Sequence, residues 1–290
     1  MHFFGDPLKI DRSANKPTLG FSLPEIESFF CRSPGIDTDF FTFITDLLNR
    51  PPWNELIDPS AFYRTICLEL AQEVQNHNKS MGLSEPAYHN RSHFQDVCIS
   101  LTLLLSQNVS SQNISSDWYF QSDDLWTLLL CAIGHDFGHD GSINKSPQEL
   151  EKRSLEKIKE VLKTCNLSSR KLQDVMRRME PIILATDPAF FNTLANKFSS
   201  NLLKFNKTDC MCMLMVESDL LASALPNYGY TLSGLLAKEW KKSNPKAADL
   251  VASNDGRTGF LNYIRFISPH SNMLGMEEIR RESIKQLQKK

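Results

Sequence analysis

The sequence lacks the long apolar segment, the strong net charge and the paired cysteines that mark several classes of protein. Its longest apolar run, residues 125–133, is far shorter than the roughly 20 residues that span a bilayer. The formal net charge of −2 gives no electrostatic reason to expect binding to nucleic acid or to a membrane surface. We therefore expect no nucleic-acid partner and no membrane insertion.

The seven cysteines are odd in number and lie mostly in apolar stretches. This usage is typical of reduced thiols in a cytosolic protein rather than of a disulfide framework. Residues 1–17 contain no signal-peptide core, and we expect a cytoplasmic location. Cys210-Met211-Cys212 is a candidate soft-metal pair, but the following Met213, Leu214 and Met215 favour a place in the core.

Signals for β-strands are nearly absent. No sustained alternation of apolar and polar residues occurs, and no Asn-Gly or Asp-Gly pair lies between two such runs. Apolar residues instead recur at helical spacing, which predicts an all-α fold with helices over residues 40–48, 62–74, 125–133, 146–163, 168–185, 210–225, 258–266 and 276–290. Residues 1–20 are predicted to be a loose arm, and residues 21–290 one compact multi-helix domain.

Four of the seven histidines lie in two short stretches, residues 88–93 and 134–144. The second stretch follows the apolar segment 125–133, which is expected to be a helix buried on all sides. Buried imidazole and carboxylate groups are costly when unpaired. The side chains of His135, Asp136 and His139 therefore need partners or a bound metal ion.

Asn90 is a candidate N-cap for a helix that begins within the first stretch. The inner face of that helix would carry Val97, Leu101, Leu104 and Leu105. If the helix begins after Asn90, His89 precedes it and points elsewhere, while His93 faces inward. If the helix instead runs through His89, the two histidines lie four apart on one face and form a ligand pair.

A third element of the candidate site is Asp219, which interrupts two apolar runs. Its carboxylate either pairs with a cation or binds a metal ion, and the absence of a nearby Lys or Arg in the sequence favours the metal. His135 and Asp136 diverge by about 100° on a helix, so they meet one ion only near a helix end, unless the carboxylate bridges two ions. Two imidazoles with two carboxylates suit zinc, iron or manganese.

The order of these residues resembles that of a known family. The matching segments are Tyr88-His89-Asn90-x-x-His93-x-x-Asp96-Val97, His135-Asp136-x-x-His139-x-Gly141-x-x-Asn144, Leu184-Ala185-Thr186-Asp187, Glu217-Ser218-Asp219-Leu220 and Gly259-Phe260-Leu261-Asn262-Tyr263-Ile264. The series covers roughly residues 60–270 and resembles the class I cyclic-nucleotide phosphodiesterases of the HD superfamily of metal-dependent phosphohydrolases. The resemblance implies an all-α catalytic domain with a binuclear metal site between helices.

The resemblance also implies hydrolysis of a 3′,5′-cyclic nucleotide to the 5′-monophosphate with two divalent metal ions. A tight ion, expected to be zinc, would be held by His93, His135, Asp136 and Asp219. Asp136 would bridge to a second ion, magnesium or manganese, and a hydroxide between the ions would attack phosphorus. His89 would be the general acid that protonates the leaving ribose O3′.

Further roles follow from the same resemblance. His139 and Asp96 would orient the metal ligands. The family's Leu-Glu acid, which hydrogen-bonds waters on the second metal, aligns best with Leu150-Glu151. Glu156 and Glu149 are alternatives, and each of these glutamates can equally lie on a solvated helix face.

Tyr88, Asp187, Arg257 and Phe260 are the candidate substrate-binding residues. Phe260 matches the family's aromatic base clamp, and Arg257 stands three residues earlier, where family members read the purine with a glutamine. A guanidinium only donates hydrogen bonds, whereas guanine offers two adjacent acceptors and adenine one acceptor and one donor. If Arg257 contacts the base, cyclic GMP is favoured over cyclic AMP. Arg257 can equally meet an extra phosphate or point to solvent.

Three other positions depart from the family pattern. Ala222 replaces an asparagine of adenine-selective members, Asp140 the proline of the animal enzymes' His-Pro-Gly, and Pro188 a pocket methionine. The catalytic residues therefore match the family, whereas the base pocket is altered. Two alternatives stay open: a phosphohydrolase for another phosphate ester, which Arg257 would suit, and a non-catalytic nucleotide-binding module.

Overall fold

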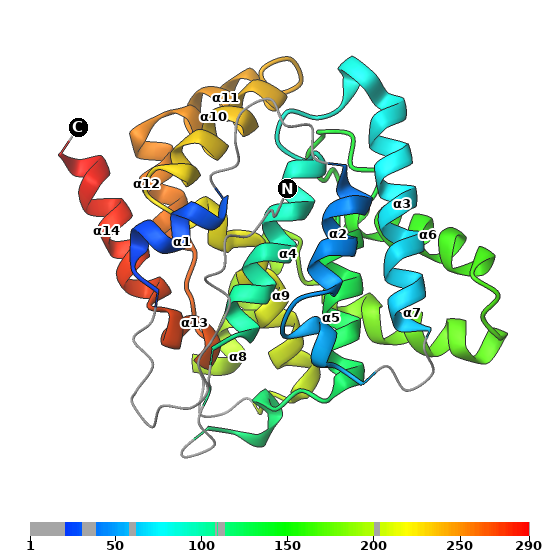
Figure 1. Cartoon of the computed structure of the whole chain (residues 1–290). Helices are drawn as coiled ribbons and strands as arrows, with labels where there is room; N and C mark the ends of the chain where they lie inside the picture. The colour runs from blue at the N-terminus through cyan, green and yellow to red at the C-terminus, as the bar shows by residue number, and fades with distance from the viewer. Residues whose placement is uncertain are drawn as a thin grey trace.

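The computed structural model describes residues 21–30, 39–57, 62–107, 109, 114–199 and 204–289. Over these residues the chain forms fourteen α-helices and no β-strand, which confirms the predicted all-α fold (Figure 1). The α-helices are α1 (Leu23–Phe30), α2 (Phe40–Leu48), α3 (Tyr63–Met81), α4 (Arg91–Leu105), α5 (Ser122–Gly134), α6 (Glu149–Thr164), α7 (Ser169–Leu184), α8 (Phe191–Ser199), α9 (Lys207–Ala224), α10 (Tyr228–Trp240), α11 (Pro245–Ala252), α12 (Asn254–Tyr263), α13 (Pro269–Leu274) and α14 (Met276–Gln288). The predicted loose arm, residues 1–20, lies outside the described residues.

Each predicted helix is present, but the boundaries of one near the site differ. The predicted helix 258–266 is α12, which begins four residues earlier and ends at Tyr263. The Ser253 side chain caps its N-terminus by accepting a hydrogen bond from the Gly256 backbone N–H at 3.0 Å. The apolar pattern misplaced the start because the first turn of α12 is polar and is fixed by this cap.

The core of the molecule contains α4, α5 and α9, which Figure 1 shows in its interior. Helix α9 packs against α4, α5, α7 and α10, and all of its residues from Asp209 to Ser218 are buried. Cys210 and Cys212 belong to this core, as predicted, and burial raises the pKa of each thiol to about 12. These three helices provide the rigid frame from which the polar residues of the site project.

Helix α10 is held at its first residues by α1, which is distant in the sequence. The Glu27 carboxylate accepts hydrogen bonds from the Asn227 backbone N–H at 2.8 Å and from its side-chain amide at 2.9 Å. A carboxylate at this end of a helix also interacts favourably with the helix dipole. The ring of Tyr228 stacks on Phe30, with ring centroids 5.6 Å apart. The other end of α10 reaches the candidate site.

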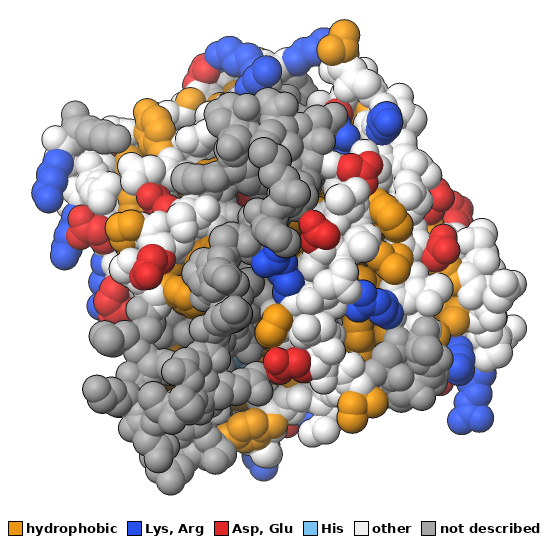
Figure 2. Space-filling view, in the orientation of Figure 1, with side chains coloured by type: hydrophobic (Ala, Val, Ile, Leu, Met, Phe, Trp, Pro, Cys, Tyr) orange, Lys and Arg blue, Asp and Glu red, His pale blue; other side chains and the backbone are white. Residues whose placement is uncertain are grey.

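The described surface shows no strong segregation of charge on the face in Figure 2, where acidic and basic side chains are interspersed. No helix among the described residues has the length and hydropathy needed to cross a membrane.

Candidate active site

Four candidate metal ligands converge between the start of α4, the end of α5 and the C-terminal half of α9. The Nε2 atom of His93 lies 3.2 Å from Asp136 Oδ2 and 3.2 Å from Asp219 Oδ1. The Nε2 atom of His135 lies 3.2 Å from Asp136 Oδ2, 3.7 Å from Asp219 Oδ1 and 3.2 Å from His93 Nε2. Residues that are 126 positions apart in the sequence thus bring their donor atoms into one small volume.

Local structure explains how these side chains meet. The Asn90 side chain caps α4 by accepting from the backbone N–H groups of Ser92 and His93, so α4 begins after His89 and directs His93 inward, as the cap predicted. Helix α5 ends at Gly134, which places His135 and Asp136 just past the helix end. Adjacent residues inside a helix point in different directions, but His135 and Asp136 lie past the helix end, so both side chains can reach the same site.

The donor set fits a divalent metal ion. Two ligands of one tetrahedral zinc ion, each about 2.0–2.2 Å from it, lie roughly 3.4 Å apart, which is close to the separations found here. The His135 Nδ1 atom lies 3.2 Å from the carbonyl oxygen of Ala132 and donates to it, so Nε2 carries the lone pair. Burial opposes a charge on His93, but hydrogen bonds to Asp136 and Asp219 outweigh it and raise the pKa of His93 to about 10. The two carboxylates thus attract a positive charge, whether a proton or a metal ion.

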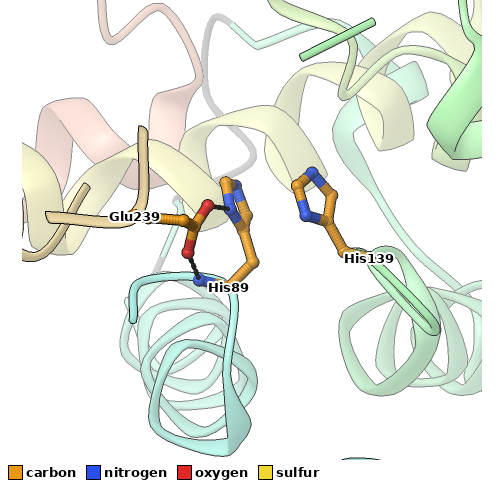
Figure 3. A group of neighbouring side chains, drawn as sticks. All are labelled: His89, His139 and Glu239. Carbon is orange, nitrogen blue, oxygen red and sulfur yellow. Dashed lines mark hydrogen bonds and ion pairs between the residues drawn. The ribbon is translucent and has the colours of Figure 1, made fainter. Parts of the chain in front are cut away.

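His89 lies beside this group and is held by Glu239 near the end of α10. The Glu239 Oε1 atom accepts a hydrogen bond from His89 Nδ1 at 2.6 Å, and Oε2 accepts from the His89 backbone N–H at 3.0 Å (Figure 3). Oε2 also accepts from the Tyr88 backbone N–H at 2.7 Å. The ring centroid of His89 is 5.6 Å from that of His93. One carboxylate therefore fixes both the backbone and the ring of His89 and leaves Nε2 free to carry a proton.

His139 lies on the other side of His89, with ring centroids 3.7 Å apart and an angle of 23° between the rings (Figure 3). The Gly141 backbone N–H donates to His139 Nδ1 at 3.0 Å. Burial lowers the pKa of His139 to about 4, so its ring is neutral at physiological pH. His89, His139 and Glu239 also lie close enough to be considered as metal ligands. Two stacked imidazole rings, however, cannot both direct an in-plane lone pair at one ion. The group of His89, His139 and Glu239 is therefore better suited to binding a proton than to binding a metal ion.

Among the three candidate glutamates of α6, Glu151 faces the site. It is buried, and both of its carboxylate oxygens accept hydrogen bonds from the Asn144 amide, at 3.2 and 3.0 Å. Burial raises the pKa of Glu151, and the negative charges of Asp187 and Asp136 add to this effect. Glu149 instead accepts from backbone N–H groups in the preceding loop, and Glu156 lines a groove between α6 and α7.

A cavity of about 310 Å³ opens beside His89 and Asp219. Its wall contains all four candidate substrate-binding residues, Tyr88, Asp187, Arg257 and Phe260, together with Pro188. Most of the remaining lining is apolar and comes from α9, α10 and α12. The carboxylate of Asp187 accepts from the backbone N–H groups of Gln148 at 2.8 Å and Ala189 at 2.9 Å, which fixes the loops at the edge of the cavity.

The structure contradicts one of the three interpretations of Arg257, which were contact with the base, contact with an extra phosphate and exposure to solvent. Its side chain is 2% exposed, so the solvent-facing alternative is wrong. Its guanidinium donates to the carbonyl oxygens of Ser223 and Leu225 and to the Ser233 hydroxyl, at 3.2, 2.6 and 3.1 Å. These acceptors lie at the C-terminal end of α9 and on α10, so the Arg257 side chain donates its hydrogen bonds to other parts of the protein.

Comparison with protein families now assigns the chain. The family model described as 3′5′-cyclic nucleotide phosphodiesterase matches residues 88–243, which is more than half of the sequence. The chain belongs to this family. Comparison with curated proteins finds no relative.

Solved structures share the fold of this phosphodiesterase. The phosphodiesterase domain of the RhoPDE fusion protein from the choanoflagellate Salpingoeca rosetta has a TM-score of 0.64 and 18% identity, with 92% of this chain and 96% of that chain covered. The structure of LmjPDEB1 in complex with IBMX has a TM-score of 0.62 and 16% identity, with 94% and 98% covered. These similarities support the all-α phosphodiesterase fold.

The structure adds Glu239 to the candidate site of the phosphodiesterase, which the sequence pattern does not reveal. It is 150 residues from His89 and lies beside Trp240 in a segment without a recognisable motif. Asp96, predicted to orient ligands, accepts a hydrogen bond from the Tyr228 hydroxyl at 2.9 Å. Its effect on the metal ligands stays a prediction.

Proposed function

We propose that this phosphodiesterase hydrolyses a 3′,5′-cyclic nucleotide to the nucleoside 5′-monophosphate with two divalent metal ions. The observation that carries the proposal is the position of His89. Its ring is held by Glu239, lies beside the four convergent ligands and lines the cavity that Asp219 also lines. A metal cluster, an acid and a pocket are the three parts that phosphoester hydrolysis needs.

His93, His135, Asp136 and Asp219 would hold the tight ion, which we propose is zinc. Asp136 would also contact the second ion, magnesium or manganese, and Glu151 would hydrogen-bond water around it. Bound ions would supply a deprotonated water at neutral pH and neutralise charge on the phosphoryl oxygens. The protein's own contribution is to hold these ligands in fixed directions and to enclose the substrate.

His89 would give a proton to the leaving ribose O3′. Its Nδ1 atom is committed to Glu239, so the proton for the leaving group resides on Nε2. The Glu239 carboxylate fixes the direction of the ring, and its two backbone hydrogen bonds hold the segment that carries His89. His139 packs against the ring and limits its rotation.

The preference for cyclic GMP rested on contact between Arg257 and the base. The donors of Arg257 are directed at carbonyl and hydroxyl oxygens of the protein, which supplies no argument for that preference. We therefore propose the reaction without a preferred base.

The test is hydrolysis of cyclic AMP and cyclic GMP with added Mg²⁺ or Mn²⁺, together with metal analysis of the purified protein. Asp219→Ala should abolish tight metal binding and turnover, while His89→Asn should keep the metal and lower the rate by roughly 10²–10⁴. Asp249→Ala, which removes an exposed carboxylate on α11, is the matched control and should behave as wild type.

The outcomes separate the competing functions. Turnover that survives in Asp219→Ala with wild-type metal content would refute the metal assignment. Bound metal without cleavage of either nucleotide would point to another phosphate ester, and a folded protein with neither metal nor turnover would point to a binding module.

A further inference from the structure

The wall of the cavity is organised by a buried arginine that has no carboxylate partner among the described residues. Arg257 on α12 contacts Ser223 and Leu225 at the end of α9 and Ser233 on α10. The C-terminal end of a helix carries partial negative charge, which stabilises a cation placed against its last carbonyl groups. Burial lowers the pKa of Arg257 to about 10, so the side chain remains charged at neutral pH. Arg257 thus joins three helices through one guanidinium.

Gly229 makes this contact possible. A Cβ atom at this position would lie 2.3 Å from the Ser223 carbonyl oxygen and 2.7 Å from Arg257 Nη2. A side chain of any size would therefore displace the guanidinium or the end of α9. The first turn of α10, the last turn of α9 and Arg257 form one packed unit.

A ligand in the cavity can reach little of this guanidinium. The side chain is 2% exposed, and the Nε atom, which has no hydrogen-bond partner in the described structure, is closed to solvent. An atom that water does not reach is also out of reach of a purine edge. With Nε closed to solvent and both Nη atoms donating to the protein, Arg257 offers a purine edge fewer free donors than an unengaged guanidinium would.

Several other polar side chains of the wall are also engaged within the protein, whereas the Trp240 indole N–H has no hydrogen-bond partner among the described residues and is closed to solvent. The Thr186 hydroxyl donates to the Ile183 carbonyl oxygen at 2.8 Å, and the Tyr263 hydroxyl donates to the Pro188 carbonyl oxygen at 2.8 Å. The Tyr88 and Ser223 hydroxyls form a pair at 3.1 Å. Among the described residues, the base would meet mainly apolar surface and the ring of Phe260.

We propose that Arg257 is a positioning residue that fixes the wall of the pocket without touching the base, so that the enzyme accepts cyclic AMP and cyclic GMP with similar efficiency. This inference rests on the proposed function. A site that hydrogen-bonds a substrate group rejects analogues that lack it by about 10⁴–10⁵, whereas an apolar pocket discriminates by only about 10–200-fold. Because Arg257 donates to the protein and not to the base, this pocket belongs with the apolar pockets, which discriminate weakly.

The first experiment uses the wild-type protein and needs no variant. The kcat/KM values are measured for cyclic AMP, cyclic GMP and the cyclic monophosphate of purine riboside, which lacks a substituent at position 6. We expect all three within about tenfold of one another, because no side chain reads position 6. A preference of more than about tenfold for one of them would overturn the proposal.

The second experiment tests positioning. Arg257→Lys and Arg257→Gln should raise KM for both nucleotides by the same factor and change kcat little, because the wall shifts while the metal ligands and His89 stay in place. The control is Arg265→Gln, which removes an exposed arginine that contacts Asn192 outside the cavity. A change of more than about tenfold in the ratio of the two kcat/KM values in Arg257→Gln would show base contact and overturn the proposal.

Binding measurements separate this inference from the proposed reaction. Calorimetric titration of His89→Asn with uncleaved cyclic AMP and cyclic GMP gives dissociation constants that do not depend on turnover. Similar constants without hydrolysis by the wild type would refute the reaction and support the role of Arg257. Constants that differ by more than about 100-fold would overturn the inference, and failure of the folded protein to bind either nucleotide would overturn both proposals.

Discussion

At the scale of single residues, Glu239 has the clearest consequence. Its carboxylate accepts three hydrogen bonds, two from backbone N–H groups and one from the ring of His89. Burial alone would raise the pKa of Glu239, but the hydrogen bond from His89 and the other donors lower it below its usual value. The group is therefore ionised at neutral pH and places a negative charge beside the His89 ring.

Glu239→Gln should lower kcat by at least about tenfold, and by no more than the roughly 10²–10⁴ that complete loss of acid catalysis costs. The amide keeps the shape of the side chain but removes the negative charge beside His89. Bound metal should stay at the wild-type amount. The control is Lys238→Gln, at the exposed neighbouring position, and unchanged kcat in Glu239→Gln would contradict this role.

The residues of the candidate site that the sequence predicts are those in local patterns. His93 stands out because it follows a helix cap, and His135 because it follows a buried helix. Asp219 stands out because it interrupts an apolar run. Glu239 carries no such signal, because its role arises only when α10 packs beside the start of α4. The role of Arg257 is hidden for the same reason, since its acceptors are backbone carbonyl groups of another helix.

At the scale of helices, α9 is tied to the segment after α12 by a buried carboxylate. Glu217 is fully buried and accepts hydrogen bonds from the backbone N–H of Ile267 and from the backbone N–H and hydroxyl of Ser268. Ser268 in turn caps α13. These hydrogen bonds fix α9, which carries Asp219, relative to the segment that follows α12, the helix that carries Arg257.

Glu217→Leu should lower the free energy of unfolding by roughly 3 kcal/mol or more, because three buried donors lose their acceptor at about 1–3 kcal/mol each. Glu217→Gln keeps one acceptor oxygen and should lose less. Urea denaturation of the metal-free proteins, followed by circular dichroism, measures both values. A Leu variant as stable as the wild type would show that water or a rearranged loop replaces the carboxylate.

At the scale of the whole molecule, the fold class could be predicted because strand periodicity is absent and helical periodicity recurs. The prediction holds best for helices with a strong apolar pattern, such as α2 and α5. It fails to identify α10 and α11, whose sequences are mixed in polarity and whose position depends on packing against α9 and against each other. The shape of the cavity depends on these elements, so the altered base pocket could be detected but not interpreted.

The stability of the whole fold should depend on pH through His270 on α13. Its ring is buried against Phe120, with ring centroids 5.8 Å apart, and burial lowers its pKa to about 4. The unfolded chain, with a histidine pKa of about 6.5, binds more protons between these values. Stability is therefore fully present above pH 6.5 and falls as the pH decreases toward 4.

Between pH 7 and 5, His270 should cost the wild type roughly 2 kcal/mol of unfolding free energy. His270→Phe removes the titrating group, so its urea midpoint should fall less over the same range. Other histidines contribute equally to both proteins and cancel in the comparison. Parallel pH dependences for the two proteins would exclude a neutral buried state of His270.

The stacked rings of His89 and His139 also have a spectroscopic consequence. Each imidazole lies within the ring current of the other, so the carbon-bound protons of both rings should resonate away from the positions of isolated histidines. Selective isotope labelling of histidine would make these signals visible in a chain that has only seven such residues. A ligand that separates the two rings would move both resonances together, and this displacement would report on the proton donor before any bond is broken.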